Sequence, residues 1–322
     1  MDSVKEKQVD LSIVTTMYYS ESFITEFYRR SSEAAAAVSA SYEIVFVNDG
    51  SPDNSLENAR ALVEKDARVR VIDLSRNFGQ HRAIMVGLEY ARGRHVFLID
   101  CDLEEDPLKL PEFFAEMKKT KADVVYGVEN DRKGGVVRRL GGAWFWYFFN
   151  LVSEVSVIPN MITSRIMSRR YVDALLRFRD RELFIDGIFF LAGFSQIPMM
   201  VEKKGRSGSS YTFRKRISLL VSAVTSFSSK PLVFVFYIGL AISLIAGIEA
   251  MILIIKRLFL DEYLLGWSSV IVSIWLMGGI GIFCLGLIGI YLAKVFQEVK
   301  NRPLSIIRDI YEKNADDSPA GN

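Results

Sequence analysis

The stretch that decides the fold is RHVFLIDCDLEEDP, residues 94–107, in which an apolar run ends in a cluster of acids. Residues i and i+2 of a strand point to the same side, so we expect Asp100 and Asp102 to present two carboxylates together while Cys101 packs on the opposite side. Paired carboxylates suit Mg²⁺ or Mn²⁺, which complete their shells with waters and phosphate oxygens. The pattern therefore predicts a divalent-metal site at the end of this strand.

The other acids of the cluster have a different interpretation. Glu104, Glu105 and Asp106 stand immediately before Pro107, where a helix is expected to begin. Acidic side chains there cap the free N–H groups of the first turn and interact favourably with the helix dipole. We assign these three acids to capping, whereas the two aspartates before them lie too early in the chain for that role.

The first 130 residues have the rhythm of an α/β series. Short apolar runs alternate with segments that suit helices. The runs are LSIVTTM (11–17), YEIVFVN (42–48), VRVIDL (69–74), RHVFLID (94–100) and DVVYGV (123–128). Their apolarity is continuous rather than alternating, which is typical of a mostly parallel, Rossmann-like sheet with helices on both faces.

Polar loops follow three of these runs. NDGSPDN (48–54) follows the second, SRNFGQH (75–81) follows the third, and the acid cluster follows the fourth. Ligands of parallel sheets bind beyond the carboxyl ends of the strands. We therefore expect the three loops to converge on one crevice.

The composition places part of the chain in lipid. Of 322 residues, 50% are hydrophobic, and the net charge of +2 gives no reason to expect a nucleic-acid partner. The two cysteines, Cys101 and Cys284, lie far apart, which argues against a disulfide framework. The charged first ten residues lack the apolar core of a cleavable signal peptide.

Two apolar stretches near the C-terminus predict two transmembrane helices. Residues 232–255 are interrupted only by Glu249 and would span roughly 36 Å as a helix, and residues 264–293 carry no charge. A buried core hairpin is the alternative, but the rest of the chain supplies no obvious shell for it. Basic residues flank both outer ends, so the sheet domain and both termini are expected in the cytoplasm, as in a bacterial inner membrane.

These motifs occur in a fixed order over almost the whole chain. The order is Tyr18–Glu21, VNDGSPDNS (47–55), LSRNFGQHRAIMVGL (74–88), the acid cluster, a basic serine–tyrosine loop and two apolar helices. In this order the sequence resembles the family 2 glycosyltransferases that load a sugar onto a polyprenyl phosphate. That family includes bactoprenol glucosyltransferases, dolichol-phosphate mannose synthase and undecaprenyl-phosphate aminoarabinose transferase. The resemblance implies a GT-A fold, a nucleotide-sugar donor and a polyprenyl-phosphate acceptor.

The resemblance also implies roles on the donor side. The residues that match nucleotide-sugar-binding positions are Thr16, Tyr18, Glu21, Asp49, Arg76, Asn77, Gly79 and Asp100. Asp49 would contact the base or ribose, and Asp102 would be the principal metal ligand beside Asp100. The opening motif departs from the family, with Thr16 for proline, Tyr19 for asparagine and Ser20 for glutamate.

The acceptor phosphate is expected at KKGRSGSSYTFRKR, residues 203–216, which supplies cations and hydroxyl donors. The residues that match the acceptor-phosphate loop of the family are Lys204, Arg206, Ser209, Ser210 and Tyr211. Arg206 is the catalytic candidate among them. The alternative is a basic cluster that only orients the membrane helices.

A second acceptor-side motif, TSRIMSRR, is kept in part. Arg165 and Arg169 match the family, but Thr163 and Ser164 stand where relatives hold an acid and an aromatic residue. Asp186 is the candidate to replace that acid.

Helices at the membrane surface are expected over residues 138–155 and 217–230, which are rich in aromatic and apolar residues. The predicted organisation is a nucleotide-sugar-binding half (1–135), an acceptor-side half with interfacial helices (136–230), two transmembrane helices (231–293) and a cytoplasmic C-terminal tail (294–322).

The expected reaction follows from the groups involved. An acceptor phosphate with a second pKa of about 6 is already a nucleophile at neutral pH, so no general base is required. A divalent ion stabilises the departing diphosphate. Together with this chemistry, the resemblance implies an inverting, metal-dependent glycosyltransferase that uses a UDP-linked donor and undecaprenyl or dolichyl phosphate at the bilayer. A processive polysaccharide synthase and a non-catalytic membrane scaffold are the alternatives, and a homo-oligomer is left open.

Overall fold

The computed structural model describes residues 9–129, 161–178, 185–201, 230–259 and 266–313. The chain divides into two compact units. The sheet unit consists of Met1–Leu140, Ser156–Ser210 and Arg302–Asn322, and the helical unit consists of Gly141–Val155 and Tyr211–Asn301. The sheet unit therefore contains both ends of the chain, and the helical unit is inserted within its sequence.

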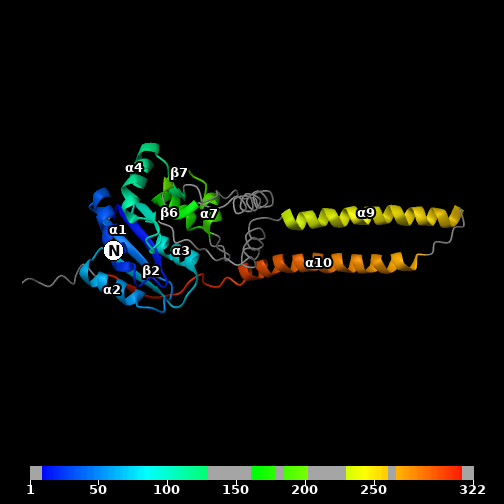
Figure 1. Cartoon of the computed structure of the whole chain (residues 1–322), viewed down its shortest axis with the longest axis horizontal. Helices are drawn as coiled ribbons and strands as arrows, with labels where there is room; N and C mark the ends of the chain where they lie inside the picture. Colours follow the sequence, from blue (N-terminus) through cyan, green and yellow to red (C-terminus); the bar gives the residue numbers. More distant parts are fainter. Residues whose placement is uncertain (1–8, 130–160, 179–184, 202–229, 260–265, 314–322) are drawn as a thin grey trace, which may run out of the picture. The chain divides into compact units, whose positions relative to one another are not determined.

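Strands and helices alternate along the sheet unit (Figure 1). The strands are β1 Leu11–Met17, β2 Tyr42–Asn48, β3 Val69–Leu74, β4 His95–Leu98, β5 Val124–Glu129, β6 Met161–Ser168, β7 Gln196–Val201 and β8 Ile307–Tyr311. The helices are α1 Ile24–Val38, α2 Ser55–Lys65, α3 Gln80–Tyr90, the 3₁₀ turn η1 Pro107–Lys109, α4 Leu110–Thr120, α6 Arg169–Leu175 and α7 Ile185–Leu191. Each apolar run identified in the sequence forms one of the first five strands.

The strands form one sheet in the order β7-β5-β6-β4-β1-β2-β3-β8. β1 pairs in parallel with both β2 and β4, and β3 pairs in parallel with β2. β6 is antiparallel to β4 and β5, and β8 is antiparallel to β3. The predicted mostly parallel α/β sheet is confirmed, and its arrangement is GT-A-like.

Apolar cores lie on both faces of the sheet. Ile13 and Phe46 pack with residues of α1, α2 and α4, whereas their strand neighbours Val14 and Val45 pack with residues of α3, α6 and α7. Burying each of these side chains contributes about 1.5–3 kcal/mol. Because helices cover both faces, the loops at the strand ends remain as the surface on which a ligand can bind.

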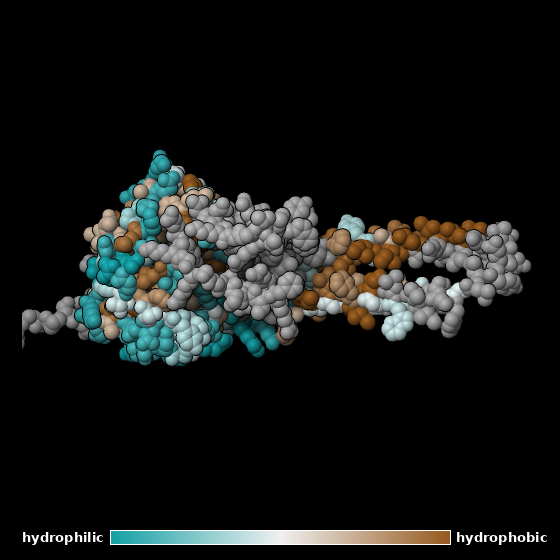
Figure 2. All heavy atoms as spheres, viewed as in Figure 1, coloured by the Kyte–Doolittle hydropathy of each residue, from teal (hydrophilic) through white to brown (hydrophobic). Residues whose placement is uncertain are grey.

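Two long helices make up the described part of the helical unit. These are α9, Lys230–Phe259, and α10, Trp267–Val299, and Figure 2 shows apolar side chains along both. Within the described residues, Ser273–Phe296 of α10 is long and apolar enough to cross a membrane, and Leu232–Ile242 of α9 is a shorter apolar stretch. One of the two predicted helices thus meets the length and composition criterion, and both membrane crossings stay predictions.

The range that the sequence assigned to a C-terminal tail contributes to the sheet. Its residues Ile307–Tyr311 form β8 and pair with Val71–Leu74 of β3. The tail assignment is therefore corrected for these five residues. The pentapeptide IRDIY has no strand alternation of its own, and the open edge of β3 supplies the hydrogen bonds that make it a strand.

Candidate active site

Four loops meet at the carboxyl edge of the parallel strands. Met17 is the register partner of Asn48, and Asn48 is the partner of Asp73, so β1, β2 and β3 end at the same level. β4 is the other parallel neighbour of β1. The loops after these strands begin at residues 18, 49, 75 and 99. The three polar loops thus begin at one edge of the sheet as predicted, and the crevice between them and its role in donor binding stay predictions.

Asp49 holds the loop that follows β3. Its carboxylate accepts the N–H of Phe78 at 2.7 Å and the N–H of Gly79 at 3.0 Å. Burial raises the pKa of Asp49, and these two amide hydrogen bonds offset part of that effect. Both carboxylate oxygens accept backbone amides of the neighbouring loop, and the contact with the nucleotide stays a prediction.

The loops after β2 and β3 also touch through their backbones. Gly50 has φ +63°, and a Cβ added there would lie 2.5 Å from the carbonyl carbon of Arg76 and 2.5 Å from the nitrogen of Asn77. Glycine is required because any side chain would overlap the facing backbone. Arg76 and Asn77 are themselves exposed, and the Arg76 guanidinium lies 4.1 Å from the ring centre of Phe78. The backbones of Arg76 and Asn77 thus pack against Gly50, while their side chains remain at the surface.

The loop after β1 presents two tyrosines. Tyr18 is 47% and Tyr19 is 62% exposed, and their rings meet edge to face at 4.8 Å. Tyr19 has φ 54°, the left-handed region in which asparagine is favoured, and its N–H donates to Ser51 Oγ at 2.8 Å. The Glu21 carboxylate accepts the side-chain N–H of Asn54 at 2.9 Å. This loop is therefore tied to the loop after β2, with aromatic rings free to face a ligand.

Thr16 lies inside β1 opposite Val47 and is half-buried. Its backbone is thus part of the strand pairing that positions the tyrosines two and three residues later. Thr16 therefore lies within the strand, one residue before its carboxyl end.

Asp100 is joined to two elements by its side chain. Its Oδ1 accepts Gln80 Nε2 at 2.8 Å, and its Oδ2 accepts the hydroxyl of Thr163 at 2.8 Å. Gln80 begins α3 and Thr163 lies in β6, so the carboxylate is oriented from both sides. Thr163 thereby contacts the acidic turn directly.

Asp102 lies two residues further along the same turn. β4 ends at Leu98, so Asp100 and Asp102 belong to the turn that follows it, and the strand alternation used to predict their direction does not apply. The placement of Cys101 in the core is confirmed, and burial raises the pKa of its thiol. Asp102 is exposed, and its Oδ1 accepts the N–H of Glu104 at 3.0 Å.

The acidic turn fits a divalent ion that takes much of its shell from elsewhere. The described ranges contain no cluster of three or more His, Cys, Asp or Glu side chains that could hold a metal ion. Mg²⁺ in phosphate-binding sites commonly uses only one or two carboxylates, with phosphate oxygens and waters as its other ligands. The exposed carboxylate of Asp102 and the oriented carboxylate of Asp100 supply that number of hard oxygen ligands.

Glu105 makes structural contacts that the sequence interpretation missed. It is 1% exposed, and its carboxylate accepts the N–H of Thr163 at 3.2 Å and the N–H of Ser164 at 2.7 Å. The predicted capping role is confirmed for Asp106, whose carboxylate accepts the N–H of Leu108 at 3.2 Å, and is wrong for Glu105. Glu105 therefore fastens the acidic turn to β6, and no local signal distinguished it from the acids beside it.

Arg165 of β6 is buried, and Arg169 is half-buried at the start of α6. Arg165 is 1% exposed, donates to the carbonyl of Thr163 at 3.0 Å and lies 3.5 Å from the ring centre of Phe189. Burial lowers the pKa of Arg165, and the negative charge of Asp186 partly offsets this. Arg169 donates to the carbonyl of Gly93 at 2.8 Å. The predicted role of Asp186 in place of the family's acid stays a prediction.

The predicted acceptor residues lie outside the described ranges. They are Lys204, Arg206, Ser209, Ser210 and Tyr211. The two segments predicted as interfacial helices, 138–155 and 217–230, lie outside them as well except for Lys230.

The sheet, the acidic turn and the interlocked loops at its carboxyl edge define a GT-A-like glycosyltransferase fold. The family model described as Glycosyl transferase family 2 matches residues 12–176, and the chain belongs to this family. A Mycobacterium tuberculosis protein named only as a glycosyltransferase is 50% identical over 94% of this chain and 88% of its own length. The SfII prophage-derived bactoprenol glucosyl transferase of Shigella flexneri is 32% identical over 94% of this chain and 99% of its own length.

The uncharacterized glycosyltransferase YkcC of Bacillus subtilis is 33% identical over 95% of both chains. Among solved structures, S. aureus TarS 1–349 in complex with UDP-GlcNAc is 18% identical, with a TM-score of 0.43 over 68% of this chain and 66% of that chain.

Proposed function

We propose that this protein is an inverting membrane glycosyltransferase that moves a sugar from a UDP-linked donor to undecaprenyl or dolichyl phosphate at the cytoplasmic face. The observation that carries the proposal is the assembly of the acidic turn with the two interlocked donor loops at one sheet edge. The near full-length similarity to a protein named as a bactoprenol glucosyl transferase supports the choice of acceptor class.

On the donor side, this chain's residues would orient a nucleotide sugar. Tyr18 and Tyr19 offer exposed rings against which a base can stack, and Arg76 offers a cation to the diphosphate. Asp100 and Asp102 would hold Mg²⁺ or Mn²⁺, which when bound stabilises negative charge on the departing diphosphate.

On the acceptor side, Arg206 and Lys204 would bind the lipid phosphate, together with hydroxyl donors from Ser209, Ser210 and Tyr211. The phosphate is already ionised at neutral pH, with a second pKa of about 6, so direct attack on the anomeric carbon needs no general base. Direct displacement inverts the configuration at that carbon.

The chain path supports two membrane crossings. β7 precedes α9 and β8 follows α10, and both strands belong to the same sheet. A chain that enters the bilayer from this sheet and returns to it would cross an even number of times. Ser273–Phe296 of α10 would supply one crossing, and the 30-residue helix α9 is the candidate for the other.

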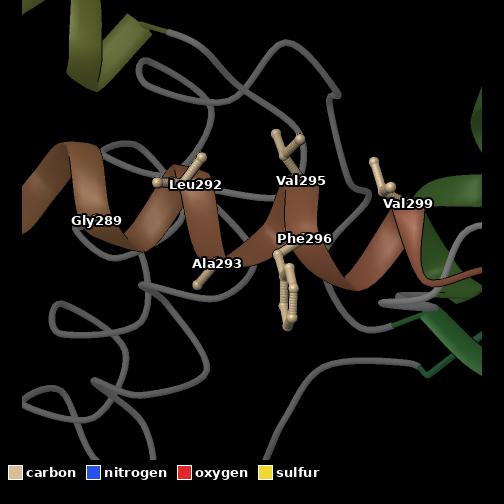
Figure 3. A pocket seen from close by; sticks show the side chains of 6 residues that line it. All are labelled: Gly289, Leu292, Ala293, Val295, Phe296 and Val299. Atoms are coloured by element: carbon tan, nitrogen blue, oxygen red, sulfur yellow. The ribbon is translucent and has the colours of Figure 1, made fainter.

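The surface of α10 is consistent with a lipid environment. Its last turns carry an apolar hollow, and Figure 3 shows the side chains that line it. These residues are Gly289, Leu292, Ala293, Val295, Phe296 and Val299. Phe296 is 58% and Val299 is 76% exposed. Contact with lipid acyl chains is more favourable for such apolar side chains than contact with water.

The test is transfer from a panel of labelled nucleotide sugars to undecaprenyl phosphate by the purified full-length protein with Mg²⁺ or Mn²⁺. We expect a lipid carrying a single sugar, and we expect Asp102→Ala to reduce its formation by about a hundredfold or more without changing the melting temperature. Asp173→Ala, the same change on the exposed face of α6, should keep full activity.

Each alternative has its own result. A polymeric product would indicate a processive synthase, and no transfer from any donor would indicate a scaffold. Unchanged activity of Asp102→Ala would exclude the proposed metal site.

A further inference from the structure

We propose that Arg308, on the strand that follows the second apolar helix, is a positioning residue for the donor loops. The proposal rests on the function proposed above for the carboxyl edge of the sheet. It assigns a role in donor binding to a C-terminal segment that lies more than 200 residues from those loops in sequence.

Arg308 occupies an irregular position in its strand. Asp73 is paired with Asp309, but the next residue, Leu74, is paired with Ile307, so Arg308 is the extra residue of a bulge. A bulge redirects the side chain of the extra residue and is frequent beside active sites. Here the redirected guanidinium reaches the carboxyl end of β3, where a donor loop begins.

The guanidinium makes two contacts at this point. Arg308 Nη1 lies 3.3 Å from Asp73 Oδ2, and Arg308 Nη2 donates to the carbonyl of Ser75 at 2.7 Å. The N–H of Ser75 in turn donates to the carbonyl of Ile306 at 2.9 Å. Both backbone polar groups of Ser75 are thus held by the C-terminal segment, and Ser75 is the first residue of the loop that leads to Arg76 and Gly79.

Asp73 extends the connection to the second donor loop. It is 1% exposed, and its Oδ1 accepts the side-chain N–H of Asn48 at 2.8 Å. Asn48 Oδ1 accepts the N–H of Ser51 at 3.2 Å. A continuous set of hydrogen bonds therefore runs from Arg308 through a buried carboxylate to the loop after β2.

The opposite end of β8 is anchored separately. Glu312 forms ion pairs with Arg70 at 2.8 Å and Arg92 at 3.1 Å, and Arg60 lies 4.4 Å from the ring centre of Tyr311. Because β8 is antiparallel to β3, these contacts lie toward the amino edge of the sheet, away from the donor loops. Glu312 therefore offers a matched control that loosens the strand without touching the donor site.

The arrangement predicts which step depends on Arg308. Without the guanidinium, Ser75 loses one hydrogen bond and the buried Asp73 loses its cation, so the distance between the segments that carry Asn48 and Arg76 is no longer fixed. Donor binding should depend on that distance. Binding of the lipid acceptor should not depend on it, so the acceptor KM should stay constant.

The experiment compares Arg308→Gln, Arg308→Lys and Glu312→Gln in the purified full-length protein, with UDP and GDP as calorimetric probes in the presence of Mn²⁺. We expect Arg308→Gln to weaken the better-bound nucleotide about fivefold to tenfold, in the range of coupled hydrogen-bond networks. Arg308→Lys, which keeps a cation for Asp73, should recover part of the loss. Glu312→Gln should lower the melting temperature while its nucleotide affinity stays that of the wild type.

The outcomes separate this proposal from the proposed function. Wild-type protein that binds neither nucleotide would overturn the donor assignment and this proposal with it. Wild-type protein that binds a nucleotide, with Arg308→Lys and any folded Arg308→Gln binding it equally well, would overturn this proposal alone. Equal weakening by Glu312→Gln would assign Arg308 a merely structural role and would also overturn it.

Discussion

Replacing Asp49 with asparagine tests the idea that this residue holds a loop. The side chain keeps its shape, but one oxygen becomes an NH₂ group that faces the N–H of Phe78 or Gly79, bonded now at 2.7 and 3.0 Å. Losing one hydrogen bond to a charged acceptor costs about 1.5–3 kcal/mol. Burial of the charged carboxylate is itself unfavourable, as the raised pKa of Asp49 indicates. The neutral amide of asparagine avoids this cost and so offsets part of the lost hydrogen-bond energy. We therefore expect a net loss of about 1–2 kcal/mol.

The assay is thermal unfolding of the ligand-free protein together with hydrogen exchange at the two amides. A loss of that size corresponds to a melting temperature lower by about 2–8 °C for a unit of this size. Exchange at Phe78 and Gly79 should accelerate, and exchange at strand amides in the core should not. Asp173→Asn removes a charge whose partner is Arg169 at 3.6 Å on the surface of α6, and because such surface ion pairs contribute little, both readings should stay unchanged.

One result would refute this reasoning. If Asp49→Asn abolishes UDP binding while the ligand-free melting temperature and both exchange rates match the wild type, Asp49 acts on the nucleotide itself and does not position the loop.

Three further predictions concern other parts of the sheet unit and the basic segment. Glu105→Gln should lower the melting temperature and the transfer rate together, because one of its two β6 amide bonds is lost, while Glu112→Gln at the surface of α4 should change neither. Burial acts to raise the pKa of Asp123, but hydrogen bonds from Arg170 and other groups outweigh this and lower the pKa below 3.8. The charged carboxylate therefore stabilises the folded protein, and this contribution is complete above about pH 4 and is lost as the pH falls below it. The melting temperature of Asp123→Asn should accordingly fall less than that of the wild type between pH 5 and pH 3. Replacing Lys204 and Arg206 together with glutamine should raise the acceptor KM by about tenfold or more and leave UDP affinity unchanged, and weakened UDP binding would contradict the acceptor assignment.

Much of the fold could be predicted because its signals are local. Five apolar runs became strands, and their continuous apolarity correctly indicated helices on both faces, since each strand residue meets a core on one side or the other. The position of the acidic turn was also predicted, because polar residues that follow buried strands of a parallel sheet gather at one edge.

Predictions about individual side chains were less successful. The strand periodicity assumed for Asp100 and Asp102 ends at Leu98, where the pairing of β4 ends. Glu105 was assigned to capping because its neighbours in sequence suit that role, yet its partners lie in β6, 58 and 59 residues away. A five-residue strand such as β8 has too few residues to show a pattern before it is paired.

The sequence by itself determined the class of fold, the edge of the sheet that carries the loops, and the family to which the chain belongs. These depend on apolar runs and short motifs that are complete within a few residues. Only the tertiary structure decided which polar group meets which: Asp49 binds an amide 29 residues away, and Arg308 meets a carboxylate 235 residues away. The physical reason is that a buried polar group must find a hydrogen-bond partner wherever the fold brings one near, and such pairing leaves no trace in the local sequence.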